Sequence, residues 1–259
     1  MWGNKRNKVK RSDKVSCKKM NKPKITVVTV SYNAVDTIEK TILSVINQTY
    51  KNIEHIIIDG ASTDGTIDVI NRYHSRITSF VSEPDKGIYD AMNKGCNLAK
   101  GDYVFFLNSD DVFYNNNVLE SVVSKMEEGL DVVYYGDVIM LPIGKRYGGS
   151  FNKWRLSVRN ICHQSIFYPR SVFEKYTYLT KYKLYADWVL NIMCKGDPFY
   201  RFQHINTIIA YFNIEGVSSS RKDASFHSDK HAIIKQHLGL LCYWYSRLRN
   251  SVHDVLLEK

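Results

Sequence analysis

Residues 25–136 alternate short apolar runs with stretches in which apolar residues recur at helical spacing, and this alternation constrains the fold more than any other feature. The runs predict strands at residues 25–30, 53–58, 77–81, 103–107 and 132–135. The stretches between them predict helices at residues 38–46, 67–73, 88–99 and 118–126. Strands and helices in this order predict an α/β fold with a mostly parallel sheet and helices on both faces.

Polar residues follow each of the first four predicted strands. The four segments are 31–33, 59–65, 83–87 and 108–111, and each contains acid or amide side chains. Sheets of this class bind ligands beyond the carboxyl ends of their strands. We therefore expect the four segments to line one crevice.

Asp110 and Asp111 come directly after the fourth predicted strand. Carboxylate oxygens are preferred ligands of Mg²⁺ and Mn²⁺, which share their coordination with diphosphate oxygens. Asn108-Ser109-Asp110-Asp111 is also favourable turn chemistry. The other three polar strand ends favour the metal interpretation, with Asp110 as the ligand and Asp111 as a second candidate.

Two other segments carry charged groups, and each has a simpler alternative. The carboxylate of Asp59 suits the imide N–H of a nucleobase, but the same segment is also a loop in which Asp64 caps the next helix. Asp85 and Lys86 combine an acid with a cation that suits phosphate, and the alternative for them is a solvated charged turn.

The net charge of +10 is concentrated at the N-terminus. Residues 1–24 contain ten Lys or Arg and one acid, whereas the remaining 235 residues contain 26 basic and 25 acidic groups. Nucleic-acid binding would therefore rest on the tail alone, and we expect this tail, residues 1–23, to be disordered. Attraction to an anionic membrane, a solubilising leader and a true start at Met20 are all open for it.

Cysteine usage indicates a reducing compartment, and hydropathy argues against a membrane span. The five cysteines are scattered and form no Cys-x-x-Cys pair, which argues against a disulfide framework or a structural zinc site. No uninterrupted apolar run approaches the ~18–20 residues that a membrane span needs. We expect a cytoplasmic protein that is peripheral at the inner face of the plasma membrane.

The pattern is looser beyond residue 136. Glycines at 144, 148 and 149 indicate a hairpin and a loop. Further expected elements are strands at 163–168, 199–202 and 208–212, a helix at 184–194, a loop at 216–228 and a helix at 229–257 that is broken near Gly239. The last helix interleaves basic residues with Leu, Tyr and Trp, which suits a membrane interface, and packing against the rest of the protein is the alternative.

Four motifs resemble those of the family 2 glycosyltransferases with a GT-A (Rossmann-like) fold, in the family's order. The motifs are Thr29 to Asn33, Ile58 to Thr66, Glu83 to Gly95 and Leu107 to Asp111. The resemblance continues more weakly through His163-Gln164 and Ala186-Asp187-Trp188, and it is strongest to bacterial enzymes that build O-antigen, capsule or exopolysaccharide. It implies a GT-A domain at 24–220, with a nucleotide-sugar half at 24–140 and an acceptor half at 141–220, and a C-terminal amphipathic helical segment at 221–259.

The resemblance also implies roles for single residues. The implied donor-binding residues are Thr29, Ser31, Tyr32, Asn33, Asp59, Asp85, Lys86, Gly87, Ala91, Asn93, Asn108 and Ser109. Asn108 and Asp110 stand at the two acidic positions of the family's D-x-D motif, so the chain departs from the pattern at the first acid. The second acid is the family's usual metal ligand and survives as Asp110, which implies Mn²⁺ or Mg²⁺ as the cofactor.

Asp187 matches the position of the family's catalytic base. Inversion is a single displacement in which an acceptor hydroxyl attacks the anomeric carbon, and a carboxylate is a natural acceptor of its proton. The alternative for Asp187 is an acid that is favoured at a helix N-terminus. His163 is a second candidate, for contact with the diphosphate, the metal or the acceptor, and its alternative is a buried core histidine.

These features together predict an inverting, metal-dependent hexosyltransferase. We expect it to move a hexose or N-acetylhexosamine from a nucleotide-diphosphate sugar, with UDP as the first choice, to a saccharide on undecaprenyl diphosphate in surface polysaccharide biosynthesis. The alternative is a carbohydrate-binding protein of the same fold with weak or no catalysis, which Asn108 alone supports. A nucleotidyltransferase or a dinucleotide oxidoreductase is disfavoured because no Gly-rich phosphate loop follows the first strand.

Overall fold

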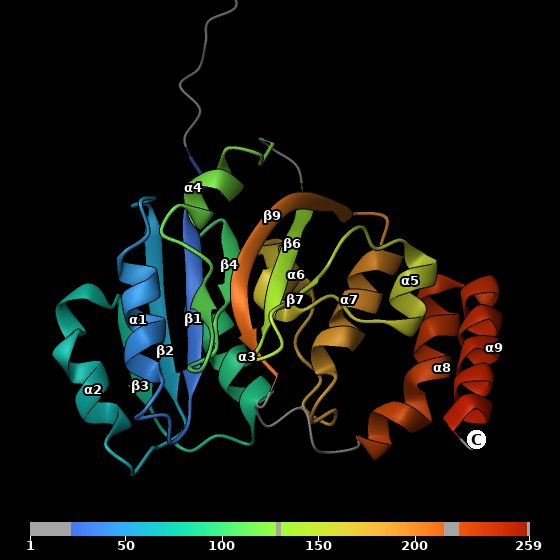
Figure 1. The fold of residues 1–259 in the computed structure, drawn as a ribbon, viewed down its shortest axis with the longest axis horizontal. Helices are drawn as coiled ribbons and strands as arrows, with labels where there is room; N and C mark the ends of the chain where they lie inside the picture. The colour runs from blue at the N-terminus through green and yellow to red at the C-terminus, as the bar shows by residue number, and fades with distance from the viewer. Residues whose placement is uncertain (1–21, 128–130, 215–222, 258–259) are drawn as a thin grey trace, which may run out of the picture.

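The computed structural model describes residues 22–127, 131–214 and 223–257, with side chains described to residue 249. Figure 1 shows a curled sheet in the middle of the molecule, with helices on both faces. The strands are β1 (Ile25–Ser31), β2 (Ile53–Asp59), β3 (Ser79–Ser82), β4 (Tyr103–Phe106), β5 (Val112–Phe113), β6 (Val132–Leu141), β7 (Lys145–Tyr147), β8 (Ile166–Pro169) and β9 (Arg201–Asn213). The α-helices are α1 (Ile38–Ile46), α2 (Thr66–Arg72), α3 (Ile88–Leu98), α4 (Val118–Val123), α5 (Lys153–Val158), α6 (Ser171–Lys175), α7 (Ala186–Gly196), α8 (Ala224–Leu238) and α9 (Leu240–Leu257), and 3₁₀ turns lie at His74–Arg76 and His163–Ser165.

The described strands form one sheet in the order β3-β2-β1-β4-β8-β6-β9-β5, with β7 paired to β6. Strands β3, β2, β1 and β4 are parallel to their neighbours. Strand β8 runs antiparallel between β4 and β6, and β6 is parallel to β9. The expected α/β fold is confirmed, and the second half of the sheet is mixed because β8 is inserted between two strands of the opposite direction.

The register of the first three strands brings their carboxyl ends level. Ser31 at the end of β1 is paired with Asp59 of β2, and Asp59 is paired with Ser82 of β3. All seven residues of β1 are buried, as the β-branched composition of this run predicts for a central parallel strand. The polar segments that follow these strands therefore begin at one edge of the sheet.

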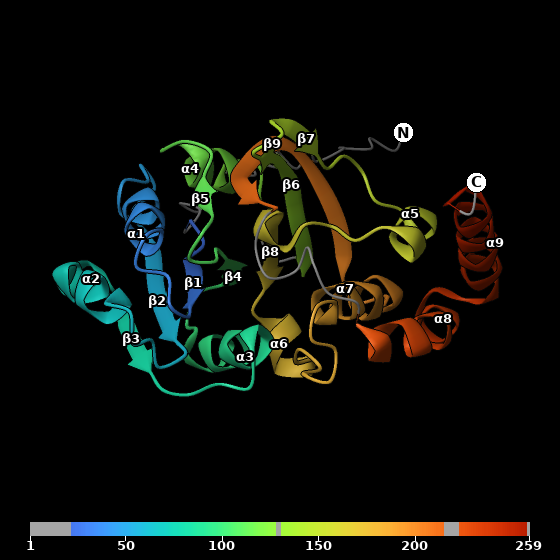
Figure 2. The same cartoon turned by 60° about the horizontal axis from the view of Figure 1, so that its bottom comes forward.

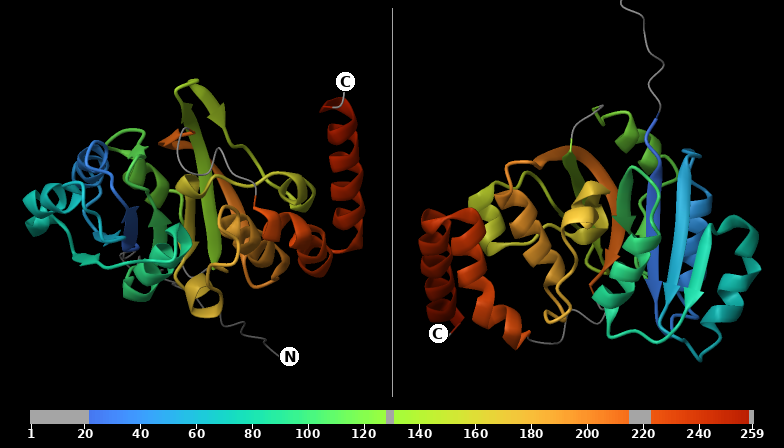
Figure 3. Two further views of the ribbon diagram at one scale, coloured as in Figure 1. Left: turned by 90° about the horizontal axis from the view of Figure 1, so that it is seen from below. Right: turned by 180° about the vertical axis from the view of Figure 1, so that it is seen from behind.

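Helices cover the two faces of this parallel half separately. Ile57 of β2 packs with Ile38 of α1 and Ile70 of α2 on one face. Helix α3 packs on the other face, and the view from behind in Figure 3 shows it in front of β1. A Cβ atom on Gly95 of α3 would lie 2.4 Å from Cγ1 of Val28, so only glycine allows this close approach of helix to strand.

Three expected elements were wrong in their extent. The two strands expected at 199–202 and 208–212 are one strand, β9, which pairs with β6 along its length. Two polar residues inside it have partners across the sheet, since His204 hydrogen-bonds the buried carboxylate of Asp137 and Asn206 accepts a hydrogen bond from Arg146 of β7. Strand β6 accordingly continues to Leu141, beyond the expected end at 135.

The C-terminal helices also differ from expectation at their start. Helix α8 begins at Ala224, where a loop to residue 228 was expected, because the side chain of Asp223 accepts a hydrogen bond from the N–H of Phe226 and caps the helix. The break at Gly239 is confirmed, since its φ of 93° ends α8 and begins α9. Helices α8 and α9 lie at the far edge from β3, with α9 outermost (Figures 1 and 2).

Two expectations lie outside the described residues: positions 1–21 of the tail expected to be disordered at 1–23, and the part of the expected loop around Arg221 and Lys222. For residues 22 and 23 the expectation was wrong, because the backbone oxygens of Lys22 and Pro23 accept hydrogen bonds from Nδ2 of Asn52 and the hydroxyl of Tyr50. Among the helices that are described, none combines the length and the hydropathy that crossing a membrane requires.

Candidate functional site

Asp59 holds the loop after β2 in place. Its carboxylate is fully buried and accepts four hydrogen bonds, from the hydroxyls of Ser31 (3.0 Å), Ser62 (2.5 Å) and Ser82 (2.8 Å) and from the N–H of Ser62 (2.9 Å). Four donors fill the capacity of a carboxylate. Asp59 therefore braces three strand ends against one another, and its contact with a nucleobase stays a prediction.

The loop after β1 is fastened to the loop after β2 by Asn33. This residue adopts a left-handed backbone (φ 47°), which asparagine tolerates better than most residues. Its N–H donates to Oγ of Ser62 (2.8 Å), and its Oδ1 accepts from the N–H of Thr63 (3.0 Å). The neighbouring side chain of Tyr32 is 66% exposed, so it is free to cover a ligand.

Gly60 lets three strand-end loops come together. A Cβ atom on Gly60 would lie 2.6 Å from Oδ2 of Asp85 and 3.2 Å from Cδ2 of Tyr32. Asp85 is oriented by the N–H of Gly87, which donates to its Oδ1 (2.7 Å). Tyr32, Gly60 and Asp85 thus form a continuous rim, and Lys86 beside it is exposed.

Ala91 and Asn93 are occupied within the protein. Ala91 is buried in the core under α3. The amide of Asn93 donates to the backbone oxygen of Tyr178 and accepts from its N–H, both at 2.9 Å. These contacts attach α3 to the segment before α7, and they do not support the expected place of the two residues in the donor pocket.

Asp110 and Asp111 have different environments although they are adjacent. Asp111 is 1% exposed, and its two oxygens accept from the N–H of Asn213 (3.0 Å) and from Nε2 of Gln164 (2.7 Å). Burial, with a contribution from the charge of Asp110, raises the pKa of Asp111 to about 7. Asp110 is only partly buried, and burial raises its pKa as well. Asp111 supports the loop, and Asp110 is the carboxylate that is available to a ligand.

Asn108, His163 and Asp187 form a line of contacts from the end of β4 to the start of α7. Nδ2 of Asn108 lies 3.0 Å from Nε2 of His163, and Nδ1 of His163 lies 3.6 Å from Oδ2 of Asp187. Oδ1 of Asn108 is buried and has no hydrogen-bond partner in the described part of the chain. The structure thus brings together three predicted site residues that are widely separated in sequence.

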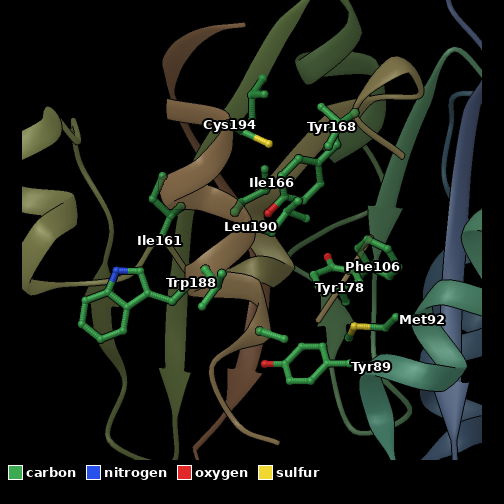
Figure 4. Close-up of a cluster of buried hydrophobic side chains, with 14 of the residues drawn as sticks. Tyr89, Met92, Phe106, Ile161, Ile166, Tyr168, Tyr178, Trp188, Leu190 and Cys194 are labelled. Atoms are coloured by element: carbon green, nitrogen blue, oxygen red, sulfur yellow. The ribbon is translucent and has the colours of Figure 1, made fainter. Parts of the chain in front are cut away.

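Asp187 lies in the first turn of α7, is 5% exposed and is held by two neutral donors. The hydroxyl of Tyr89 lies 2.8 Å from its Oδ1, and Nδ2 of Asn160 donates to its Oδ2 (2.7 Å). Figure 4 shows the ring of Tyr89 extending from α3 toward the start of α7. Burial and the nearby charge of Asp187 raise the pKa of Tyr89 well above its usual value, so its hydroxyl keeps its proton.

Sequence reasoning gave no role in the site to four residues that support its carboxylates. Two of them contact Asp187, namely Tyr89 and Asn160, and two contact Asp111, namely Gln164 and Asn213. Tyr89 lies inside the third motif, so a signal for it existed. Trp188, beside Asp187, is a core residue, because its ring is 9% exposed and its Nε1 donates to the backbone oxygen of Leu156 (2.8 Å).

The donor set at the end of β4 fits a hard divalent cation. Within the described residues, no three His, Cys, Asp or Glu side chains are grouped so that they could hold an ion by themselves. Asp110 offers one carboxylate, and Mg²⁺ or Mn²⁺ commonly takes one or two carboxylates from the protein and its other ligands from phosphates and water. The loop therefore suits an ion that binds together with a diphosphate.

Residues 26–207, most of the chain, match the family model described as Glycosyl transferase family 2. The chain belongs to this family. As a family 2 glycosyltransferase it is 34% identical over 215 residues to a "PGL/p-HBAD biosynthesis glycosyltransferase" of Mycobacterium tuberculosis, which covers 80% of this chain and 84% of that protein. It is 30% identical over 247 residues to the Escherichia coli "UDP-Glc:alpha-D-GlcNAc-diphosphoundecaprenol beta-1,3-glucosyltransferase WfaP", with coverage of 88% and 94%.

A solved structure agrees with this assignment at the level of the fold. The mannosyltransferase PcManGT of Pyrobaculum calidifontis, solved in complex with GDP-Man and Mn²⁺, matches 89% of this glycosyltransferase and 65% of its own chain, with a TM-score of 0.59 and 16% identity. The fold is GT-A, as the motifs implied.

Proposed function

We propose that this glycosyltransferase inverts the anomeric centre and moves a hexose or N-acetylhexosamine from a UDP-sugar to a saccharide carried on a lipid diphosphate. The relative WfaP, which is aligned over nearly its whole length, carries UDP-glucose and a diphosphoundecaprenol-linked acceptor in its name. A product with a β linkage from an α-linked donor is the expected outcome, and surface polysaccharide biosynthesis is the expected setting.

One observation carries the proposal: a buried carboxylate, Asp187, faces the end of β4 across His163. An acceptor hydroxyl between Asp187 and the donor attacks the anomeric carbon from the face opposite the diphosphate. The new C–O bond forms as the bond to the diphosphate breaks, UDP leaves with the bonding electrons, and Asp187 takes the hydroxyl proton. Tyr89 and Asn160 hold both carboxylate oxygens, so the base is fixed before the acceptor arrives.

The donor binds along the rim made by Tyr32, Gly60 and Asp85, with its diphosphate toward Asn108 and Asp110. Thr29, Ser31, Asn33, Lys86, Gly87 and Ser109 complete the proposed donor-binding set. Asp59, whose carboxylate already accepts four hydrogen bonds, contributes by holding the loop after β2. Asp110 would hold Mn²⁺ or Mg²⁺, and the ion would supply positive charge to offset that on the departing diphosphate. The buried Oδ1 of Asn108 gains a partner if it accepts a hydrogen bond from the donor, because an unpaired buried oxygen is costly.

The test compares Asp187→Asn with Asp68→Asn, an exposed acid on α2. Asparagine keeps the shape of the side chain but accepts a proton poorly, so we expect kcat to fall by about 10²-fold or more with the Kd of UDP unchanged. UDP release and NMR of the product's anomeric proton are the readouts. Full activity in Asp187→Asn would exclude the assigned base, and an absence of turnover by the unaltered chain with a panel of donors would favour the binding-protein alternative.

The outer face of α9 supports peripheral membrane binding. Leu241, Trp244 and Leu248 are 72%, 58% and 67% exposed and share one face of the helix, and the exposed residues Arg247 and Arg249 flank it. Figure 3 shows α9 at the outer edge of the molecule. An apolar face beside arginines suits the surface of an anionic bilayer, where the lipid-linked acceptor lies.

Cosedimentation with vesicles tests this part of the proposal. We expect binding to phosphatidylglycerol vesicles that weakens with salt, and little binding to phosphatidylcholine alone. Replacing both Leu241 and Leu248 with glutamate should abolish sedimentation, whereas Leu98→Glu, at a partly exposed leucine of α3, should not. If the double glutamate variant sedimented with vesicles as well as Leu98→Glu does, the membrane contact would not lie on α9.

A further inference from the structure

Four polar side chains from three separate segments are joined by hydrogen bonds that end on the carboxylate of Asp187. The hydroxyl of Tyr168 in β8 donates to Oδ1 of Asn191 (2.7 Å), and Nδ2 of Asn191 donates to Oδ1 of Asn160 (2.9 Å). Nδ2 of Asn160 in turn donates to Oδ2 of Asp187 (2.7 Å). Tyr168 and Asn191 are fully buried, and Asp187 is nearly so. We call these four residues the polar network.

Helix α7 supplies two members of the polar network, one turn apart. Asp187 and Asn191 are four residues apart, so they lie on the same face of the helix. Asn160 lies between α5 and β8 in the sequence, and its single amide donates to Asp187 and accepts from Asn191. Asn160 therefore bridges one turn of α7, and its own orientation depends on Asn191.

The direction of each hydrogen bond in the polar network follows from the carboxylate at its end. An ionised carboxylate only accepts, so Asn160 has to present its nitrogen to Asp187 and its oxygen to Asn191. Asn191 then presents its nitrogen to Asn160 and its oxygen to Tyr168. Turning either amide round would set two oxygens against each other, at 2.7 or 2.9 Å. Burial raises the pKa of Tyr168 well above its usual value, so its hydroxyl keeps the proton that it donates.

We propose that Asn191 and Tyr168 are positioning residues that act through Asn160 to hold the carboxylate of Asp187 in one orientation. This rests on the proposed role of Asp187 as the base. The last torsion of an aspartate side chain is soft, so the carboxylate turns unless its oxygens are held. Asn160 holds Oδ2 only while its own amide is held by Asn191. A base that turns spends less time aligned with the acceptor hydroxyl, and kcat falls.

Two replacements loosen the polar network at different distances from Asp187. Asn191→Leu keeps most of the side-chain volume but gives Asn160 no donor, so we expect kcat to fall about fivefold. Tyr168→Phe removes only the hydroxyl at the far end, and we expect a fall of about threefold. The Kd of UDP should be unchanged in both variants, because neither residue belongs to the proposed donor-binding set.

Tyr200→Phe is the matched control for the loss of a buried tyrosine hydroxyl. Tyr200 is also buried, and its hydroxyl donates to the backbone oxygen of Ser171 (3.0 Å) and not to a member of the polar network. Tyr200→Phe should lower the Tm about as much as Tyr168→Phe does and leave kcat unchanged, at a temperature where both variants are folded. An equal fall of kcat in the two variants would assign the effect to general loosening and would overturn the inference.

A double-mutant cycle tests whether Asn191 acts through Asn160. In the background of Asn160→Ala, the replacement Asn191→Leu should lower kcat less than about twofold, because the contact through which it acts is already absent. The same fivefold fall in both backgrounds would show that Asn191 does not act through Asn160. If Asn191→Leu does not fold, Tyr168→Phe takes its place in the cycle, with a threefold fall expected only where Asn160 is present.

The outcomes separate this inference from the function on which it rests. If Asp187→Asn loses activity while Asn191→Leu and Tyr168→Phe keep the kcat of the unaltered protein, the base stands and the inference is wrong. Full activity in Asp187→Asn would exclude the base itself, and the inference with it.

Discussion

Replacing Lys230 with methionine should make this protein more stable at neutral pH. Lys230 lies on α8 and is only 7% exposed. Its ammonium is placed 4.3 Å from the ring centroid of Trp188 and 6.0 Å from that of Phe226. Burial lowers its pKa from 10.5 to about 8, and no acid in the described residues contributes to the shift. Within the described residues, this ammonium therefore has aromatic neighbours and no ion-pair partner.

The size of the effect follows from the shift in pKa. A lowering from 10.5 to about 8 corresponds to about 3 kcal/mol at ~1.4 kcal/mol per unit. Contact of the desolvated cation with the face of Trp188 offsets about 1–2 kcal/mol of this burial cost. Methionine keeps most of the apolar stem and needs no hydration, so Lys230→Met should gain about 1–2 kcal/mol in the free energy of unfolding at pH 7.

The sign of the pH dependence is also defined. Because the folded-state pKa lies below the unfolded-state value, the unfolded state binds more protons between about pH 8 and 10.5, and the stability of the unaltered protein rises with pH in that window. The advantage of Lys230→Met is therefore complete below pH 8 and shrinks above it. Urea unfolding at pH 7 and pH 9.5, followed by tryptophan fluorescence, measures both values.

Lys235→Met is the matched control, since Lys235 is an exposed residue of the same helix. It should change the free energy of unfolding by less than about 0.5 kcal/mol at either pH. The reasoning is refuted if Lys230→Met is less stable than the unaltered protein at pH 7, or if its advantage is the same at both pH values. The first result would mean that its contacts stabilise the ammonium, and the second would mean that burial does not lower its pKa.

Three further replacements have expected outcomes. Gly95→Ala sets a Cβ atom 2.4 Å from Val28, so thermal unfolding should show a loss of about 1–3 kcal/mol in the free energy of unfolding. An unchanged stability would mean that α3 can move away from β1. Gly60→Ala sets a Cβ atom 2.6 Å from Oδ2 of Asp85 and should displace that side chain. Calorimetry should then show that UDP binds about tenfold more weakly, at an unchanged Tm. An unchanged affinity for UDP would remove Asp85 from the proposed donor site. Asn160→Ala leaves one oxygen of the proposed base without its donor, so kcat should fall about tenfold or more with the Kd of UDP unchanged, and a loss in that Kd alone would argue against the assignment.

The parallel half of the fold could be predicted because its signals are local. The run Ile25 to Val30 is β-branched throughout, and every residue of β1 is buried as such a run predicts. The second half could not be predicted equally well. Strand β9 contains His204 and Asn206, which break the apolar run into two, and both contact the Asp137–Arg146 pair of neighbouring segments. Only the completed sheet makes those polar residues acceptable in one strand.

The candidate site divides in the same way. The strand-end segments were predictable, because parallel strands in level register bring their polar ends together. The supports of Asp187, the proposed base, and of the loop after β4 were not predictable, because Tyr89 is 98 residues from Asp187 in sequence and Asn213 is 102 residues from Asp111. No sequence spacing predicts which tyrosine hydroxyl or backbone N–H will meet a given carboxylate. Such partners are chosen by the packing of α3 and β9 against the end of the sheet.

The position of Asp187, the proposed base, depends on the C-terminal helices as well as on the sheet. Asp187 and Trp188 are consecutive in α7, and Trp188 packs against Phe226 of α8, with ring centroids 5.2 Å apart. Phe226, Leu238 and Cys242 belong to the same buried cluster as Val28 of β1 and Met92 of α3. Helices α8 and α9 thus complete the core that orients α7. The outer face of α9, which we propose to bind a bilayer, is therefore connected through packed side chains to Asp187, the proposed base.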